Sequence, residues 1–433
     1  RRADAEPPPS HEGALRLHRR RARARAHDRR RARGGPQEQG AARPGPLPRP
    51  LRGRPAARPP HDGLLAGHPG EPPLEHHRRA GRRGARPPRG LLRLAGRAGV
   101  TGTPLKGVLV GFGKVAEAAH LPAFRGSPGF SLQAVVEADP ARRQAAAAAL
   151  PGARVYPTLT ELLARERGLD FVDVAAPPWL HAPLALEALG AGLHVLCEKP
   201  LATSPSDLDA LAAAARKAGR ALVCVHNWKK APLVVRLKEL LDAGASGPVH
   251  EAHWHVLRTQ PAADAGGGWR LDPARAGGGV VMDHGWHAFY LLSWLLGKRP
   301  TGAHAVLSPA ARAEEEASVL ADFGGVPASV RLSWRAPARG HWGLFRGPEG
   351  SVEMLDDRLI LRRGEERTSH VFREALSAGS AHPEWFRDLL PDFADAVARP
   401  EARAAALEEA LDAMKVVSLC YGAAPSPARK RRG

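Results

Sequence analysis

From Leu105 onward, short β-branched runs alternate with alanine- and leucine-rich segments of helical periodicity, and this alternation constrains the fold most. A helix separates each strand from the next, so the simplest solution is a parallel, doubly wound sheet. The helix after Asp139-Pro140 has an expected start, with an aspartate cap and a proline at the first helical position. The predicted strands are 106–110, 131–138, 169–175, 193–197 and 221–226, and the helices are 115–124, 141–150, 181–189 and 207–218.

The pattern changes after about residue 227, where strands follow one another without helices between them. Successive strands predict an open, mainly antiparallel sheet. We therefore expect an α/β chain with a Rossmann nucleotide-binding domain at 104–227 and an α+β substrate-binding and oligomerisation domain at 228–424, with the ligand site between them. The elements expected in the second domain are helices 232–243, 281–296, 383–398 and 401–421, and strands 249–259, 303–308, 317–323, 328–334, 340–345, 350–354 and 358–362.

The formal charge of +20 is concentrated in the N-terminal quarter of the chain. Residues 1–104 hold 25 Arg, no Lys and 8 acids, a net of 25 − 8 = +17, which leaves 20 − 17 = +3 for the rest. This segment has no aromatic residue, isoleucine or methionine, so it cannot build a core. We interpret 1–103 as a disordered Arg/Pro-rich arm or a mis-assigned gene start, and 425–433 as a basic tail. A nucleic-acid partner is not expected, because aromatic side chains for base stacking are missing.

Composition favours a reduced, cytoplasmic protein. The three cysteines, Cys197, Cys224 and Cys420, are too few and too scattered for a disulfide scaffold or a zinc site. No apolar run approaches the ~20 residues that cross a bilayer, so no membrane partner is expected. His253 and His255 would lie on one face of a strand and His250 on the other, so no metal site is expected.

A glycine-rich turn between the first strand and the first helix indicates a dinucleotide site. Gly111 permits a tight turn and Gly113 lets the backbone approach a pyrophosphate. The helix starting at Lys114 and Val115 would offer its free N–H groups and positive dipole end to the phosphates.

Glu137, at the end of the second strand, can accept hydrogen bonds from the adenosine ribose hydroxyls. A carboxylate there would repel a 2′-phosphate, so NAD is the expected cofactor. Asp139 is the competing candidate, but its place before Pro140 fits a helix cap better. Arg142 and Arg143 lie close in sequence to the same corner and keep NADP as the alternative.

The candidate chemical groups come from two places. Glu198-Lys199-Pro200 follows a strand of the parallel sheet, at the end where ligands collect. If a helix starts near residue 281, Asp283 and His287 share one face, and the carboxylate could fix an imidazole that exchanges protons near neutral pH. The alternatives are a surface ammonium at Lys199, and a solvated ion pair or a helix-start arrangement at Asp283 and His287. The acidic run 314–316 is expected to be a solvated strand entry.

Together these motifs resemble the glucose-fructose oxidoreductase and inositol dehydrogenase family, Gfo/Idh/MocA. The resemblance covers residues 106 to about 421. Its most specific marks are Gly111-x-Gly113, Glu198-Lys199-Pro200, and the triple glycine 277–279 followed by Asp283-x-x-x-His287. Pro177, His181 and the pair Trp269-Arg270 support it.

The resemblance implies roles for these residues. Lys199, with a cis bond to Pro200, would hydrogen-bond the reacting oxygen and relay its proton. His287 would be the general acid/base, with Asp283 orienting it or contacting a substrate hydroxyl. The nicotinamide would lie near Pro177 and Glu198, with His181 in the same loop.

The implied function is hydride transfer between NAD(P) and a hydroxyl or carbonyl carbon of a sugar, polyol or related small molecule. A cofactor-bound sensor or scaffold without turnover is the alternative. The family likeness also implies a homo-oligomer, a dimer or tetramer.

Three positions depart from the family pattern. Pro178 stands where the family often has asparagine, which puts one polar contact near the nicotinamide in doubt. Lys229-Lys230 replaces a common arginine, and Ala116 takes the third glycine position.

Overall fold

The computed structural model describes residues 103–260, 268–309, 313–379 and 381–422. The predicted arm 1–103, apart from its last residue, and the basic tail 425–433 lie outside the described residues. No helix among the described residues combines the length and apolar character that a membrane span needs.

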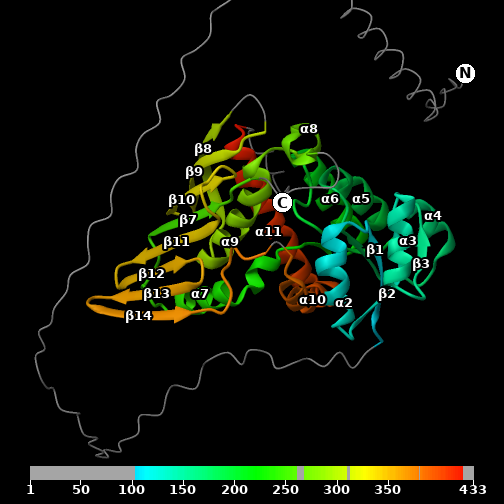
Figure 1. The fold of residues 1–433 in the computed structure, drawn as a ribbon, viewed down its shortest axis with the longest axis horizontal. Coiled ribbons are helices and arrows are strands. Elements are labelled where there is room, and N and C mark those ends of the chain that lie inside the picture. The colour runs from blue at the N-terminus through cyan, green and yellow to red at the C-terminus, as the bar shows by residue number, and fades with distance from the viewer. Residues whose placement is uncertain (1–102, 261–267, 310–312, 380, 423–433) are drawn as a thin grey trace, which may run out of the picture. The chain divides into compact units, whose positions relative to one another are not determined.

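The first half of the described chain forms a parallel sheet, as predicted. Its six strands have the order β3-β2-β1-β4-β5-β6, in which the chain crosses over after β3 (Figure 1). The strands are β1 (Leu105–Val110), β2 (Phe130–Val136), β3 (Arg154–Tyr156), β4 (Phe171–Val174), β5 (His194–Cys197) and β6 (Leu222–Cys224).

Helices cover both faces of this sheet. One face, which includes Val108, Val172 and Val195, packs against α4 (Leu159–Arg165), α5 (His181–Gly190) and α6 (Pro205–Ala218). The other face meets the π-helix η1 (Ala116–His120), α2 (Leu121–Arg125) and α3 (Pro140–Ala149). Asp139 caps α3 by accepting the N–H of Arg142 at 2.9 Å, as its position before Pro140 predicts. Sequence analysis missed β3 and α4, which are only three and seven residues long.

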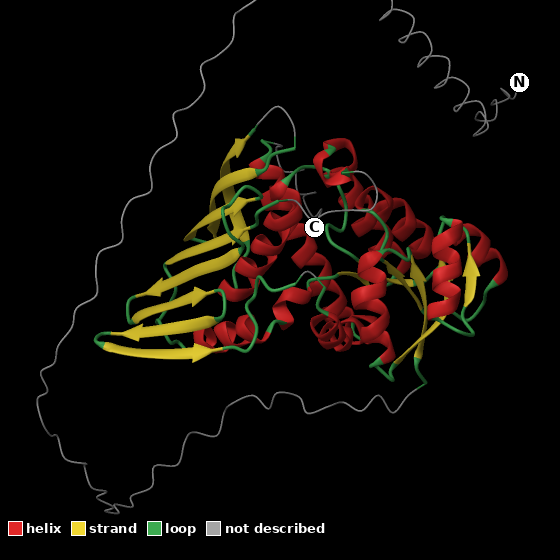
Figure 2. Ribbon diagram, viewed as in Figure 1, coloured by secondary structure: helices red, strands yellow, loops and turns green. Residues whose placement is uncertain are grey.

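The second sheet has eight strands in the order β14-β13-β12-β11-β7-β10-β9-β8. All pairs are antiparallel except β7 with β10, because β7 is inserted between β10 and β11. Figure 2 shows helices against one face of this sheet. The strands are β7 (Glu251–Leu257), β8 (Pro300–Ser308), β9 (Glu316–Phe323), β10 (Val326–Ser333), β11 (Gly340–Gly347), β12 (Gly350–Leu355), β13 (Arg358–Arg363) and β14 (Glu366–Val371), the last of which was not predicted.

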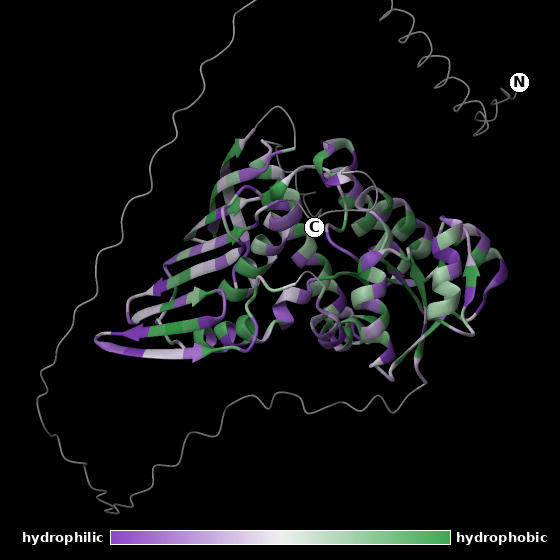
Figure 3. Cartoon of the chain, viewed as in Figure 1, coloured by the Kyte–Doolittle hydropathy of each residue, from purple (hydrophilic) through white to green (hydrophobic). Residues whose placement is uncertain are grey.

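The strands of this sheet carry alternating apolar and polar residues, visible as bands of colour in Figure 3. In β7, Ala252, Trp254 and Val256 are buried while the residues between them are partly exposed. The covering helices begin with α7 (Pro232–Asp242). After the short helices η4 (Trp269–Leu271) and α8 (Pro273–Ala276) comes the π-helix η5 (Val281–Gly285), which continues into α9 (Trp286–Leu296).

The C-terminal helices α10 (Pro383–Ala398) and α11 (Pro400–Cys420) join the two sheets. The sequence assigned both to the second domain, but α10 packs on the parallel sheet. There Phe386 and Phe393 join a buried cluster with Phe124, Phe130 and Phe171. The long helix α11 contacts β6 on one side and α9 and β8 on the other.

Candidate active site

Gly111 forms the turn at the end of β1 and has no substitute there. Its φ is +91°, and a Cβ at this position would lie 2.8 Å from the carbonyl oxygen of Ala175. The following helix begins at Lys114, so the N–H groups of Gly113, Lys114 and Val115 have no intrahelical acceptor. A strand, a tight glycine turn and free helix N–H groups fit the pyrophosphate of a dinucleotide.

Glu137 lies beside this turn, at the end of β2. Its carboxylate accepts the N–H of Phe112 at 2.7 Å and the N–H of Asp139 at 2.8 Å. A Cβ at Gly113 would lie 3.5 Å from a guanidinium nitrogen of Arg142, while Arg143 donates to the carbonyl of Glu137 at 2.9 Å. The structure therefore brings the carboxylate and Arg142 to the glycine turn, where both could meet the adenosine end of a cofactor.

Lys199 and Asp283 meet although they are 84 positions apart. Lys199 follows β5, and its bond to Pro200 is cis, as predicted. Its Nζ donates to Asp283 Oδ1 at 2.5 Å and to the Asp283 carbonyl oxygen at 3.1 Å. Both side chains are 18% exposed, so the pair remains open to a ligand. Burial alone would raise the pKa of Asp283, but the Lys199 ammonium holds it well below its usual range.

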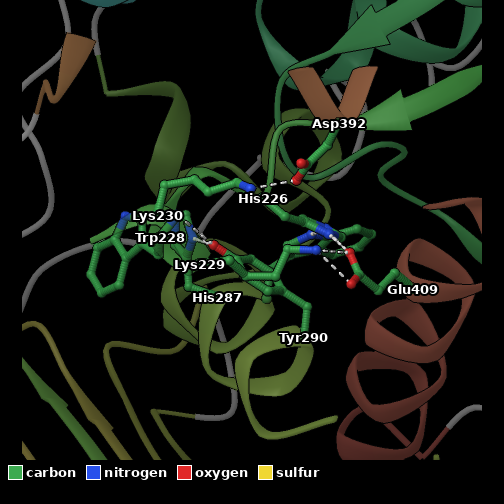
Figure 4. A network of polar contacts seen from close by, with 9 residues as sticks. His226, Trp228, Lys229, Lys230, His287, Tyr290, Asp392 and Glu409 are labelled. Atoms are coloured by element: carbon green, nitrogen blue, oxygen red, sulfur yellow. Dashed lines mark hydrogen bonds and ion pairs between the residues drawn. The ribbon is translucent and has the colours of Figure 1, made fainter. Parts of the chain in front are cut away.

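His287 follows Asp283 by one helical turn, in α9. Its ring stacks on Trp228 with centroids 4.5 Å apart, and its Nδ1 lies 3.0 Å from the hydroxyl of Tyr290 (Figure 4). Burial, assisted by the charge of Lys199, lowers the pKa of His287 well below its usual value, so the imidazole is neutral at pH 7. Asp283 pairs with Lys199, and Tyr290 and Trp228 hold the imidazole.

A second polar network lies behind Tyr290. His226 stacks on Tyr290 at 3.9 Å and accepts the indole N–H of Trp286 at Nε2, 3.1 Å away. Its Nδ1 therefore donates to Glu409, at 2.8 Å. Lys229 also donates to Glu409, at 2.6 Å, as Figure 4 shows.

The two lysines that depart from the family pattern anchor the C-terminal helices. Lys229 reaches Glu409 in α11, and Lys230 reaches Asp392 in α10 at 2.7 Å. Both pairs are visible in Figure 4.

Glu198 is held by a buried histidine that sequence analysis overlooked. His120 Nε2 lies 3.0 Å from Glu198 Oε1, and His120 Nδ1 lies 2.7 Å from Asp173 Oδ2. Glu198 Oε2 accepts the N–H of Lys199 at 3.0 Å. Burial would lower the pKa of His120, but the two carboxylates raise it to about 10, so the ring is a cation. The available signal was an aspartate inside the apolar strand Phe171–Val174.

His181 positions the backbone near Pro177. Its Nδ1 lies 2.7 Å from the carbonyl oxygen of Pro200 and its Nε2 lies 2.8 Å from that of Ala176. The ring therefore connects the Ala176-Pro177 loop to the segment after Lys199. Pro178 is buried in the 3₁₀ turn Pro178–Leu180.

The prediction of a solvated run at 314–316 is wrong for Glu314, which is 3% exposed. Its carboxylate accepts the N–H groups of Gly279 and Val281, each at 3.0 Å, and the hydroxyl of Tyr421 at 2.6 Å. A Cβ at Gly279 would lie 2.0 Å from the Glu314 carbonyl oxygen. The glycine run therefore lets Glu314 cap the helical segment that carries Asp283 and His287. Sequence alone could not distinguish it from its two acidic neighbours.

Two family models match this chain. Residues 105–226 match the oxidoreductase family with an NAD-binding Rossmann fold, and residues 234–353 match the GFO/IDH/MocA C-terminal domain. Together they cover more than half of the chain.

Individual proteins agree with these matches. A putative UDP-kanosamine synthase oxidoreductase subunit from Amycolatopsis mediterranei is 29% identical over 74% of this chain and 96% of its own length. A 1,5-anhydro-D-fructose reductase from Ensifer adhaerens is 34% identical, over 40% of this chain and about half (52%) of that protein. The crystal structure of GenD2 from gentamicin A biosynthesis in complex with NAD is 28% identical, with a TM-score of 0.63 over 77% of this chain and 98% of that one.

Proposed function

Because the chain belongs to the Gfo/Idh/MocA oxidoreductase family, we propose that Lys199, Asp283 and His287 carry the proton chemistry of an NAD(P)-dependent sugar or polyol oxidoreductase. The observation that supports these roles is the 2.5 Å contact between Lys199 and Asp283, with His287 one turn further along the helix. The Lys199 ammonium contacts the Asp283 carboxylate, and its charge also acts on the His287 imidazole.

The glycine turn and the residues beside it would hold the cofactor. The backbone would approach the pyrophosphate closely at Gly111 and Gly113. The helix N–H groups of Lys114 and Val115 would bind its oxygens. Glu137 would accept the ribose hydroxyls, which favours NAD over NADP. When bound, the nicotinamide accepts or supplies the hydride.

Lys199 would bind the oxygen of the reacting carbon. Its ammonium would stabilise the alkoxide that forms as a hydroxyl loses its proton, or polarise a carbonyl in the reverse direction. The Asp283 carboxylate orients the ammonium, and the backbone N–H of Lys199 is fixed by Glu198.

His287 would transfer the proton. The Tyr290 hydroxyl can accept a hydrogen bond from His287 Nδ1, which leaves the lone pair of Nε2 for a substrate hydroxyl. A neutral imidazole is the form that an oxidation requires, and burial beside Lys199 keeps it neutral.

We also propose that the protein acts as a cytoplasmic homo-oligomer through the outer face of the second sheet. Val306 and Leu320, on the paired strands β8 and β9, are 67% and 61% exposed on that face, so their apolar side chains are available to a second copy of the chain. Light scattering at micromolar concentration should give a dimer or tetramer mass, and a monomer mass would refute this.

The proposed function is tested by a panel of sugars and polyols with NAD and with NADP, followed at 340 nm. Turnover of at least one compound, slowed at least about 100-fold by His287→Asn, supports the proposal. NADH binding without turnover of any compound would instead favour the sensor or scaffold.

A further inference from the structure

Arg258 occupies an unusual place for a charged residue. It follows β7, where Ala252, Trp254 and Val256 point to the buried face of the sheet. Arg258 continues that alternation and is only 7% exposed. Successive side chains of a strand alternate between faces, so its guanidinium lies on the face covered by helices, where its charge acts on Asp283 and His284 of η5.

Among the described residues, no carboxylate forms an ion pair with Arg258. Its guanidinium donates to the carbonyl of Leu257 at 2.8 Å and to His341 Nε2 at 3.3 Å. A guanidinium can only donate, so His341 is the acceptor and directs its Nδ1 proton to Asp356, 3.3 Å away. His341 is therefore neutral, so it neither adds to the positive charge of Arg258 nor cancels it. A buried cation usually has an anion in contact.

Arg258 is also next to the chemical groups. Its guanidinium carbon lies 6.0 Å from the centroid of Trp228, the ring on which His287 stacks. The charges of Asp356 and Asp283 both act on Arg258 without an ion pair to either. Asp283 is already paired with Lys199 and lies 3.9 Å from Arg270, and Asp356 accepts backbone N–H groups from His341 and Ser377. Within the described part of the chain, Arg258 is therefore left without a carboxylate of its own.

We propose that Arg258 binds an anionic substituent, a carboxylate or a phosphate oxygen, of the substrate that Lys199 and His287 act on. The inference rests on the proposed function and narrows its substrate class to acidic or phosphorylated sugars. The planar guanidinium beside an indole can hold either group through charge-assisted hydrogen bonds. In this arrangement the anion is the missing counter-ion, and the sugar ring extends from it towards Lys199.

The test compares four probes by calorimetry on the NADH-loaded protein: glucose, glucuronate, glucose 6-phosphate and UDP-glucose. We expect at least one anionic probe to bind at least about tenfold more tightly than glucose, a difference of about 1.4 kcal/mol. Preference for glucuronate would identify a carboxylate, and preference for a phosphorylated probe would identify a phosphate. Arg258→Gln should reduce that preference to under about threefold.

Arg331→Gln is the matched control, because Arg331 lies on the neighbouring strand β10 and is paired with Glu316 at 2.9 Å. It should keep the full preference. Arg258→Lys, which retains a charge, should keep part of it if Arg258→Gln fails to fold. Equal affinity for glucose and all three anions, or an undiminished preference in both Arg258 variants, would overturn the inference. In either case, turnover of a neutral sugar would leave the proposed function standing, whereas failure to bind NADH would count against that function itself.

Discussion

Glu314→Gln should destabilise the protein far more than the same change two positions later. The Glu314 carboxylate is buried and accepts two backbone N–H groups and the Tyr421 hydroxyl. Glutamine keeps one of the two acceptor oxygens. Its NH2 group replaces the other and would face a backbone N–H group from which it cannot accept a hydrogen bond. The loss of one or two hydrogen bonds to a charged group, at about 1.5–3 kcal/mol each, gives a cost of about 1.5–6 kcal/mol.

For a folded region of this size, each kcal/mol lowers Tm by about 2 °C, so Tm should fall by about 3–12 °C. Glu316→Gln is the control. Glu316 pairs with Arg331 at 2.9 Å but is 31% exposed, and such surface pairs contribute about 0–1 kcal/mol. Differential scanning calorimetry measures both variants. If their Tm values agree within experimental error, Glu314 does not cap the segment in the way described.

Three further predictions concern the cofactor end of the site. Gly111→Ala should abolish NADH binding in a fluorescence titration, because φ is +91° and the new Cβ would lie 2.8 Å from a carbonyl oxygen; an unchanged Kd would contradict this. Glu137→Ser should shift the ratio of NADPH to NADH affinity at least about tenfold towards NADPH, since a carboxylate repels a 2′-phosphate, and a constant ratio would count against that role. The pKa of His120 is raised from 6.5 to about 10, so its contribution to stability is complete below pH 6.5 and is lost as pH rises to about 10. Urea unfolding between pH 7 and 10 should show this decline in the wild type and a shallower one in His120→Gln, and identical slopes would refute it.

The fold could be predicted from sequence to the extent that local patterns determine it. The sequence predicted every strand of both sheets except β3 and β14. The patterns that allowed this were the glycine turn, the capped helix after Asp139 and the alternation of apolar and polar residues along the strands. The short β3 and α4 were missed, because three to seven residues carry too little periodicity. The position of α10 could not be predicted. An amphipathic pattern indicates that one face of a helix is buried, but it does not indicate which sheet covers that face.

The site was predictable where motifs are local, and less so where contacts are distant in sequence. Lys199 and Asp283 were both predicted as site residues, but their direct contact depends on packing between residues 84 positions apart. His120 and Glu314 were missed because a histidine in a helix and an acid in a charged run usually face solvent. Their roles depend on contacts that only the folded chain makes: His120 with Asp173 and Glu198, and Glu314 with the triple glycine.

If Lys199 and His287 act on one substrate oxygen, the rate of the chemical step must depend on both side chains. Single-turnover measurements would compare the wild type with Lys199→Met and His287→Asn, using a substrate from the panel and saturating cofactor. Each variant should slow hydride transfer by about 10²–10⁴-fold while the Kd for NADH changes less than about threefold. A wild-type rate in either variant, with cofactor bound, would contradict the claim.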